Sequence, residues 1–426
     1  MKKDHLKLSK IVGTALIVIL PLLYLNAEEV VRPEEIVSKR LVVYDNETYN
    51  ELAGQWKAYN SAYPSEYAYA NWMYAARYAG DEDYKELLEQ GLEKYPANPT
   101  ILYLKSQEKH GKHDNQEGRR FLETAIALDP NYADPWFSLV IHYMDDGDEE
   151  RIDFALRRIL ESGVVQDEVM DYCYNMLLSV EENAIIISNG DNDTYPIWIL
   201  TRILKIRPDV TVANRSLLNT DWYPLYLIKQ GIPSFIAKRE LTDLRESIIA
   251  GIRGNKQTIP PTGPFGDTLI LKIIESAEHA ERPVYFAPTL YVTKDLKKIA
   301  KNGRLLGLVT LVTSARISYA KQLRQSFNEW LDNFRTGGLN SWRLRYSSKT
   351  DAGFQLISNY ACGLATCLDS LKVYAPNLRG ALFQWHLRHL DKLPAKAICE
   401  HVLPAWCRQT DIDEIKRWCK EKGIKP

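Results

Sequence analysis

Residues 45–165 carry apolar side chains at helical spacing, interrupted by proline and glycine at regular intervals. Pro64, Pro96 and Pro130 recur at intervals of 32 and 34 residues. Because proline lacks an N–H and clashes with a continuing helix, each marks a point where one helix ends. After Pro130, Trp136 and Leu139 lie three positions apart, on one face of the next helix. The pattern therefore predicts a tandem series of short, paired helices.

This period resembles that of the tetratricopeptide repeat. The unit around residues 66–94 has aromatic and small residues on its first helix, a turn at Gly80-Asp81, and leucines on its second helix. Gly147-Asp148 supplies the same turn in the clearest unit, which begins near Pro130. The resemblance implies a stack of helical hairpins over 45–165 that binds another protein through its groove.

Tyrosines are concentrated in this region, where eleven of the chain's 25 lie between Tyr44 and Tyr103. A tyrosine-rich concave surface would grip a peptide or a sugar, whereas tetratricopeptide helices also use tyrosine to pack against one another. The sequence leaves both interpretations open. The candidate residues for contact with a partner are Tyr67, Tyr74, Trp136 and Tyr143.

From residue 166 to residue 315 the helical period gives way to short apolar runs between helices. Strands are expected at 184–188, 210–213, 283–287 and 305–312. Helices are expected at 197–206, opened by Pro196, and at 267–278. Strands that alternate with helices favour a mostly parallel sheet with right-handed crossovers. We therefore predict a Rossmann-like α/β domain over 166–315.

Polar residues follow the first two strands, at the edge of a parallel sheet where ligands bind. Asp191 and Asp193 form an Asp-x-Asp pair, and such carboxylates suit Mg²⁺, Mn²⁺ or Ca²⁺. Aspartate and asparagine in these loops also cap turns and helix starts, so both a divalent-cation site and a cap stay open. The candidate ligand-binding residues are Asn189, Asp191, Asn192, Asp193, Asn214, Ser216, Asn219 and Asp221.

Four blocks in this region carry a family resemblance. The first is Asn189-Gly190-Asp191-Asn192-Asp193-Thr194-Tyr195-Pro196-Ile197-Trp198, and 207–210, 214–223 and 282–287 follow in order. Together they resemble the soluble C-terminal domain of bacterial multi-spanning membrane proteins that are similar to protein O-mannosyltransferases. A glutamate usual in that family is Leu306 here. The similarity covers about residues 165–315.

The resemblance implies a role around sugar transfer rather than the transfer itself. Family members carry many transmembrane helices, and transfer from a lipid-linked donor is expected in their membrane-embedded part. This chain has at most one candidate span. The resemblance therefore implies an extracytoplasmic accessory domain, detached from its membrane enzyme and joined to helical repeats.

We predict a helical C-terminal region over 316–426, with helices at 317–334, 352–373, 380–392 and 411–422 and a break at Gly337-Gly338. Five of the six cysteines lie in the last 65 residues. In an exported chain this clustering favours disulfides, with buried free thiols as the alternative. The cysteines are Cys173, Cys362, Cys367, Cys399, Cys407 and Cys419.

Residues 1–27 have the pattern of an export signal. Four lysines precede an apolar run over 11–25, which fits either a cleaved signal peptide or an uncleaved signal anchor. As a helix the run would be about 22 Å long, against the ~30 Å hydrocarbon core of a bilayer. We therefore expect a membrane association through this segment and a periplasmic location for the rest of the chain.

Charge is distributed in blocks along a chain whose net charge is −1. Residues 28–165 carry 15 basic and 27 acidic side chains, and residues 316–426 carry 18 basic and 10 acidic ones. Such blocks are typical of separate modules, although ordinary solvated faces give the same picture. The absence of an overall basic field argues against a nucleic-acid partner.

These features favour an exported, membrane-associated interaction protein of the bacterial cell envelope. Its repeats would bind a protein partner, and its α/β domain a ligand or partner, in glycan or glycoprotein assembly. One alternative is a metal-dependent glycosyltransferase-like or glycan-processing enzyme that uses Asp191 and Asp193. Another is a fixed structural subunit of an envelope complex. No catalytic residue and no certain cofactor are assigned.

Overall fold

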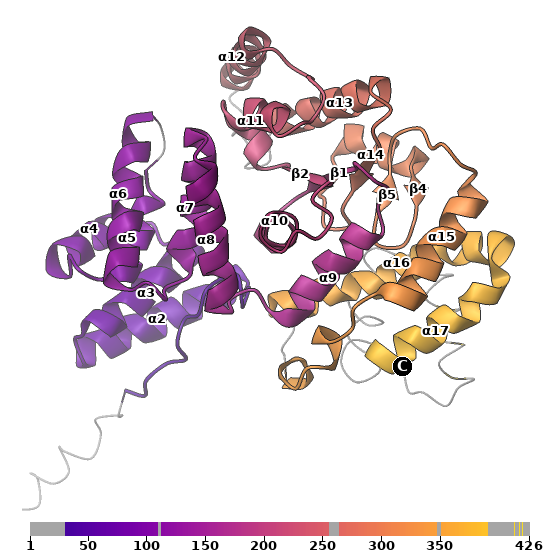
Figure 1. The fold of residues 1–426 in the computed structure, drawn as a ribbon. Coiled ribbons are helices and arrows are strands. Elements are labelled where there is room, and N and C mark those ends of the chain that lie inside the picture. Colours follow the sequence, from indigo (N-terminus) through magenta and orange to yellow (C-terminus); the bar gives the residue numbers. More distant parts are fainter. Residues whose placement is uncertain are drawn as a thin grey trace, which may run out of the picture. The chain divides into compact units, whose positions relative to one another are not determined.

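The computed structural model describes residues 30–109, 112–254, 264–346 and 351–390, with three single positions at 413, 417 and 420. It is mostly helical, with one small sheet (Figure 1). The chain forms two compact units. The N-terminal unit combines the residues up to Ile36 with Asp45–Leu104, and the C-terminal unit combines Val37–Tyr44 with the chain from Lys105 onward. This division falls inside the predicted repeat region.

The N-terminal unit consists of helices with well-defined ends. These helices are α2 (Asn46–Ala62), α3 (Glu66–Ala79), α4 (Tyr84–Lys94) and most of α5 (Pro99–Ser106). Asp45 and Ser65 cap α2 and α3 by accepting hydrogen bonds from the N–H groups of Thr48 and Ala68. Gly80 ends α3 with a φ of 76°, a conformation that favours glycine.

Four more helices continue in the C-terminal unit: α6 (Lys112–Leu128), α7 (Asp134–Asp146), α8 (Glu149–Ser162) and α9 (Asp167–Leu178). α6 packs on α7, and α7 packs on α8. Gly147 ends α7 with a φ of 70°, and Asp148 caps α8. The helices begin and end near the predicted breaks, so a helical repeat region is supported. Its identity as a tetratricopeptide array stays a prediction.

The sheet is mixed, with five short strands in the order β2-β1-β3-β5-β4. β1 (Ile185–Ser188) pairs in parallel with β2 (Thr211–Asn214) and with β3 (Val284–Phe286). The predicted single strand over 305–312 is wrong, because this segment is a hairpin of β4 (Arg304–Leu305) and β5 (Thr310–Leu311), antiparallel to β3. Gly307, with a φ of 83°, turns the chain between them. In the part of the chain that the structure describes, the sheet is small and mixed, and a complete Rossmann domain is not shown.

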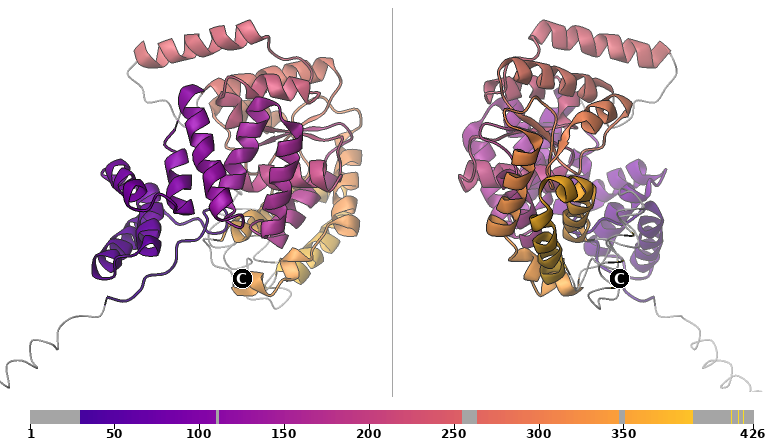
Figure 2. Two further views of the ribbon diagram at one scale, coloured as in Figure 1. Left: turned by 60° about the vertical axis from the view of Figure 1, so that its left-hand side comes forward. Right: turned by 90° about the vertical axis from the view of Figure 1, so that its right-hand side faces the viewer.

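The helices around the sheet are α10 (Asp191–Trp198), which continues as a π-helical turn over Ile199–Ile203, α11 (Tyr223–Lys229), α12 (Lys238–Gly254), α13 (Pro264–His279) and α14 (Lys294–Asn302). In every view α12 lies outermost, beyond α13 (Figures 1 and 2).

Pro196 does not open a helix as predicted, since α10 begins five residues earlier, at Asp191. Because Pro196 has no N–H for the carbonyl of Asn192, that carbonyl accepts a hydrogen bond from Cys173 Sγ at 3.7 Å instead.

The C-terminal region contains α15 (Tyr319–Asn333), α16 (Ala352–Tyr374) and α17 (Pro376–Leu390), with short 3₁₀ turns at Gly338–Asn340 and Arg343–Tyr346. An aromatic cluster of Trp330, Tyr360 and Trp385 joins the three helices, with ring centroids 5.4–5.7 Å apart. Gly338 lies so close to the backbone of Glu168 that a Cβ there would stand 2.3 Å from the Glu168 nitrogen. The predicted break at Gly337-Gly338 therefore coincides with a close contact to α9.

Several expectations fall on residues outside those described. They are the signal segment 1–27, most of the helix over 411–422, and Cys399, Cys407 and Cys419. Cys173 and Cys367 are buried free thiols, and burial raises the pKa of Cys367 to about 11. Within the described ranges, no helix combines the length and the apolar character needed to cross a bilayer.

Arg207 fixes the chain where it enters β2. Its guanidinium donates hydrogen bonds to the carbonyls of Leu177, Val180 and Glu181 at 2.8–3.0 Å and pairs with Asp209 at 2.8 Å. The Arg207 guanidinium lowers the pKa of Asp209 to about 2. An Arg-Pro-Asp block that carries the family resemblance therefore has a structural role.

Asp209 predicts a specific pH dependence of stability. A carboxyl whose pKa falls on folding stabilises the fold above its unfolded value of about 3.9, and this contribution is lost as pH falls toward 2. Asp209→Asn should therefore be less stable than the wild type at neutral pH and approach it between about pH 4 and 2. Chemical unfolding across this range measures the difference. The exposed-site control Asp332→Asn should parallel the wild type throughout, and a constant deficit for Asp209→Asn would contradict the assignment.

Candidate functional site

The carboxyl ends of β1, β2 and β3 lie at one edge of the sheet, which we call the carboxyl edge. It consists of residues 189–193, 214–221 and 287–291, and the hydrogen bonds show that these loops touch. Ser216 Oγ donates to the carbonyl of Asn189 at 3.3 Å, and the N–H of Tyr291 donates to Asn189 Oδ1 at 3.4 Å. The structure thus brings the two predicted loops together and adds a third, after β3.

Asp193 lies at the centre of this edge and is 2% exposed. Its carboxylate accepts hydrogen bonds from the N–H groups of Asn189 and Gly190 at 3.0 and 2.9 Å, and from the hydroxyl of Thr289. Burial raises the pKa of this carboxyl above its ordinary value, and the three donors oppose that rise. Asp193 therefore closes the loop and starts α10, as a capping residue does.

Asp191 points elsewhere. Two residues along a helix turn through about 200°, so the side chains of positions 191 and 193 leave α10 on opposite sides. Asp191 is half-exposed and pairs at 3.0 Å with Arg40, which also pairs with the buried Asp134 at 2.9 Å. The Arg40 guanidinium lies 4.0 Å from the ring centre of Phe137.

Throughout the described ranges, no group of His, Cys, Asp and Glu side chains is arranged to hold a metal ion.

Asn214 and Asn219 are also engaged within the fold. Asn214 is 4% exposed, donates to Thr194 Oγ1 at 2.9 Å and accepts from the N–H of Leu217 at 3.0 Å. Asn219 Oδ1 accepts from the N–H of Gly266, in the first turn of α13, at 3.0 Å. A Cβ on Gly266 would stand 2.9 Å from the carbonyl oxygen of Arg215, so glycine permits this approach.

The remaining predicted residues lie nearer solvent. Ser216 is exposed, Asn192 is half-buried, and Asp221 is exposed with its nearest ion-pair partner, Arg245, at 3.8 Å. The edge thus exposes Asp191, Ser216 and Asp221, buries Asp193 and Asn214, and leaves Asn189, Asn192 and Asn219 partly buried. The predicted ligand-binding role of these eight residues stays a prediction.

Sequence reasoning missed an ion pair beneath the edge. Arg215 is fully buried and its Nε lies 2.7 Å from Asp267 Oδ1, 52 residues later. The exposed ring of Tyr291 lies 5.6 Å from the same guanidinium. The only sequence signal was the position of Asp267 at the start of a predicted helix, which says nothing about its partner.

The carboxyl edge therefore uses its own side chains to satisfy backbone groups that other α/β domains offer to ligands. Phosphates bind to free N–H groups at helix starts. Here the N–H groups of Asn189, Gly190, Leu217 and Gly266 are taken by Asp193, Asn214 and Asn219. This arrangement is chemically suited to holding three loops in place.

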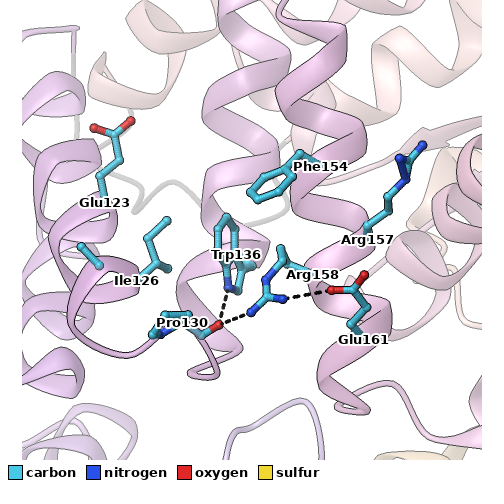
Figure 3. Close-up of a pocket in the computed structure, with 9 residues that line it drawn as sticks. Glu123, Ile126, Pro130, Trp136, Phe154, Arg157, Arg158 and Glu161 are labelled. Atoms are coloured by element: carbon cyan, nitrogen blue, oxygen red, sulfur yellow. Dashed lines mark hydrogen bonds and ion pairs between the residues drawn. The ribbon is translucent and has the colours of Figure 1, made fainter.

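A second site lies in the helical region, between the end of α6, the start of α7 and α8 (Figure 3). This groove has a volume of about 450 Å³. Its floor is apolar and includes Ile126, Trp136 and Phe154. The rings of Trp136 and Phe154 meet edge to face, with their centroids 5.6 Å apart. Phe154 is 55% exposed, so part of this apolar floor is open to solvent.

The candidate partner-contact residues fall into different environments. Trp136 lines the groove, although it is 5% exposed overall. Tyr74 and Tyr143 are 3% and 6% exposed, so they pack inside their own units, as the packing interpretation expects. Tyr67 is 37% exposed and accepts a hydrogen bond from Arg32 at 2.8 Å. Phe154 was not identified as a contact residue from the sequence, because the helical pattern alone does not show whether an apolar side chain is buried or exposed.

Comparison with known proteins gives one match. A family model described as TMEM260-associated domain 2 matches residues 169–231, which run from α9 through β1, α10 and β2 to the end of α11. This segment contains all eight predicted ligand-binding residues. No curated protein and no solved structure matches the chain.

The two aspartates of the Asp-x-Asp pair should respond differently to substitution. Asp193→Asn removes an acceptor from buried N–H groups and should lower the free energy of unfolding by about 1–3 kcal/mol. Asp191→Asn, at a half-exposed ion pair, should change it by about 1 kcal/mol or less. Thermal or urea unfolding of the two variants measures this. A pair that bound a metal jointly would instead give similar stabilities without metal and an equal loss of Mn²⁺-induced stabilisation.

Proposed function

We propose that this protein is an extracytoplasmic, membrane-associated interaction protein that works alongside a glycosylation machinery of the cell envelope. In this proposal the N-terminal apolar segment holds the chain at the membrane. The helical region docks a protein partner, and the α/β domain serves as a rigid accessory domain whose exposed edge residues form a second contact surface.

The observation that carries the proposal is the groove over Trp136 and Phe154. Burying a side chain the size of phenylalanine contributes roughly 1.5–3 kcal/mol, so leaving it exposed is a cost unless another molecule covers it. The match to TMEM260-associated domain 2 supports the glycosylation-related context. The resemblance of residues 165–315 to a domain of protein O-mannosyltransferase-like proteins points to the same context.

The enzymatic alternative has less support from the geometry. A metal-dependent transferase needs two carboxylates that converge on one ion and free donors for a diphosphate. Asp191 and Asp193 diverge, and Asp193 is already held by Asn189, Gly190 and Thr289.

A fixed structural subunit is the second candidate function, and one observation favours it. The carboxyl edge is filled by the chain's own side chains, as expected for a ligand pocket that has become part of the scaffold. An interaction protein dissociates from its partner, whereas a fixed subunit does not. Mixing the purified tagged complex with untagged chain distinguishes them, because the untagged chain enters the complex only if the partner dissociates.

Phe154→Ser tests the docking role. Because Phe154 is largely exposed, the variant should fold with nearly wild-type stability, while losing a partner that co-purifies in stoichiometric amount with the full chain from envelope membranes. Leu204→Ser, at a position that is 44% exposed and outside the groove, is the matched control and should retain the partner. Equal retention by both variants, or a partner-free chain that turns over a sugar donor, would refute the proposal.

A further inference from the structure

The charged residues around the groove differ in whether they already have partners. Glu123 pairs with Arg119 at 2.9 Å, and Glu161 pairs with Arg158 at 3.0 Å. Arg157, on α8, makes no hydrogen bond or ion pair with any residue that the structure describes, and no dashed line reaches it in Figure 3. The groove thus combines an apolar floor with four charged side chains, of which Arg157 is the one without a hydrogen-bond or ion-pair partner among the described residues.

Arg157 lies in a segment of the chain that is acidic overall. Residues 112–162 carry 12 acidic and 6 basic side chains. At physiological ionic strength charges are screened beyond about 8 Å, so a group bound in the groove responds mainly to the charges at its rim. Both carboxylates at the rim already have arginine partners, so an anion bound there would pair with Arg157.

The polar atoms at the floor of the groove already have partners within the chain. Trp136 Nε1 donates to the carbonyl of Pro130 at 3.3 Å, and Arg158 donates to the same carbonyl at 3.0 Å. A sugar would have to leave hydroxyl groups without partners against this floor, which is unfavourable. An apolar or aromatic side chain carries no such penalty and can pack on the rings of Trp136 and Phe154.

We propose that the groove binds an extended peptide segment of the partner that carries an apolar or aromatic side chain beside a carboxylate. The apolar side chain packs on Trp136 and Phe154, and the carboxylate pairs with the Arg157 guanidinium. This inference rests on the proposed docking function and specifies the chemistry of the docked segment.

Fluorescence anisotropy of short labelled peptides with the full chain tests this. The probes are a peptide with phenylalanine next to glutamate, the same peptide with glutamine, and a third in which serine replaces phenylalanine. We expect the glutamate peptide to bind about two- to fivefold more tightly than the glutamine peptide, the range of an exposed ion pair. The serine peptide should lose most of its binding.

Two charge variants identify the cation responsible. Arg157→Gln should abolish the preference for glutamate over glutamine while still binding the phenylalanine peptides. Arg120→Gln makes the same change of charge at an exposed position of α6 outside the groove and should keep the preference. Phe154→Ser should weaken both phenylalanine peptides equally.

Three results would overturn the inference: equal binding of the glutamate and glutamine peptides by the wild-type chain, loss of the preference in both arginine variants, or tighter binding of a neutral oligosaccharide than of any peptide. Absence of peptide binding together with a partner that still depends on Phe154 would reject the peptide chemistry and leave the docking function intact. Peptide binding without any partner that depends on Phe154 would reject the docking function and leave the peptide chemistry of the groove intact.

Discussion

The carboxyl edge of the sheet depends on one constraint: the backbone N–H groups exposed where strands end and helices begin must find acceptors. Asp193 meets this constraint for Asn189 and Gly190, and Asn214 and Asn219 meet it for the neighbouring loops. The start of α10, the turn after β2 and the contact of that turn with the start of α13 depend on these bonds. Because an unsatisfied buried donor costs about 1–3 kcal/mol, residues that satisfy several donors at once stabilise the whole edge.

The groove in the helical region shows the opposite situation. There the polar groups are satisfied by Pro130, Arg158 and Glu161, but apolar surface and one cation are left uncovered. An edge that is complete in itself and a groove that is incomplete suggest different roles within one chain. We therefore propose that the helices recognise a partner and that the sheet serves as a scaffold, within the glycosylation-related context that the family match suggests.

The sequence predicted the elements whose signal is local. The strands at 185–188 and 211–214 contain short apolar runs, Ile185–Ile187 and Val212–Ala213, that end in polar residues. The helix breaks near 80 and 147 need glycine at positive φ, so both kinds of element could be located. The prediction from Pro196 was wrong because Asp193, in the first turn of α10, accepts hydrogen bonds from the preceding loop, so the helix starts at Asp191. Cys173 compensates for the hydrogen bond that Pro196 cannot donate. The pair Arg215–Asp267 joins residues 52 positions apart, and the exposure of Phe154 depends on what surrounds it. Neither fact is contained in a local pattern.

Amide hydrogen exchange at the carboxyl edge tests the central claim most directly. If the N–H groups of Gly190 and Gly266 are held by Asp193 and Asn219, they should exchange slowly in the free protein, on the timescale of the strand amides of β1. Adding Mn²⁺ and a nucleotide sugar should leave their protection unchanged. Fast exchange in the free protein that becomes slow when the nucleotide sugar is added would contradict the account, since it would show that these groups await a ligand.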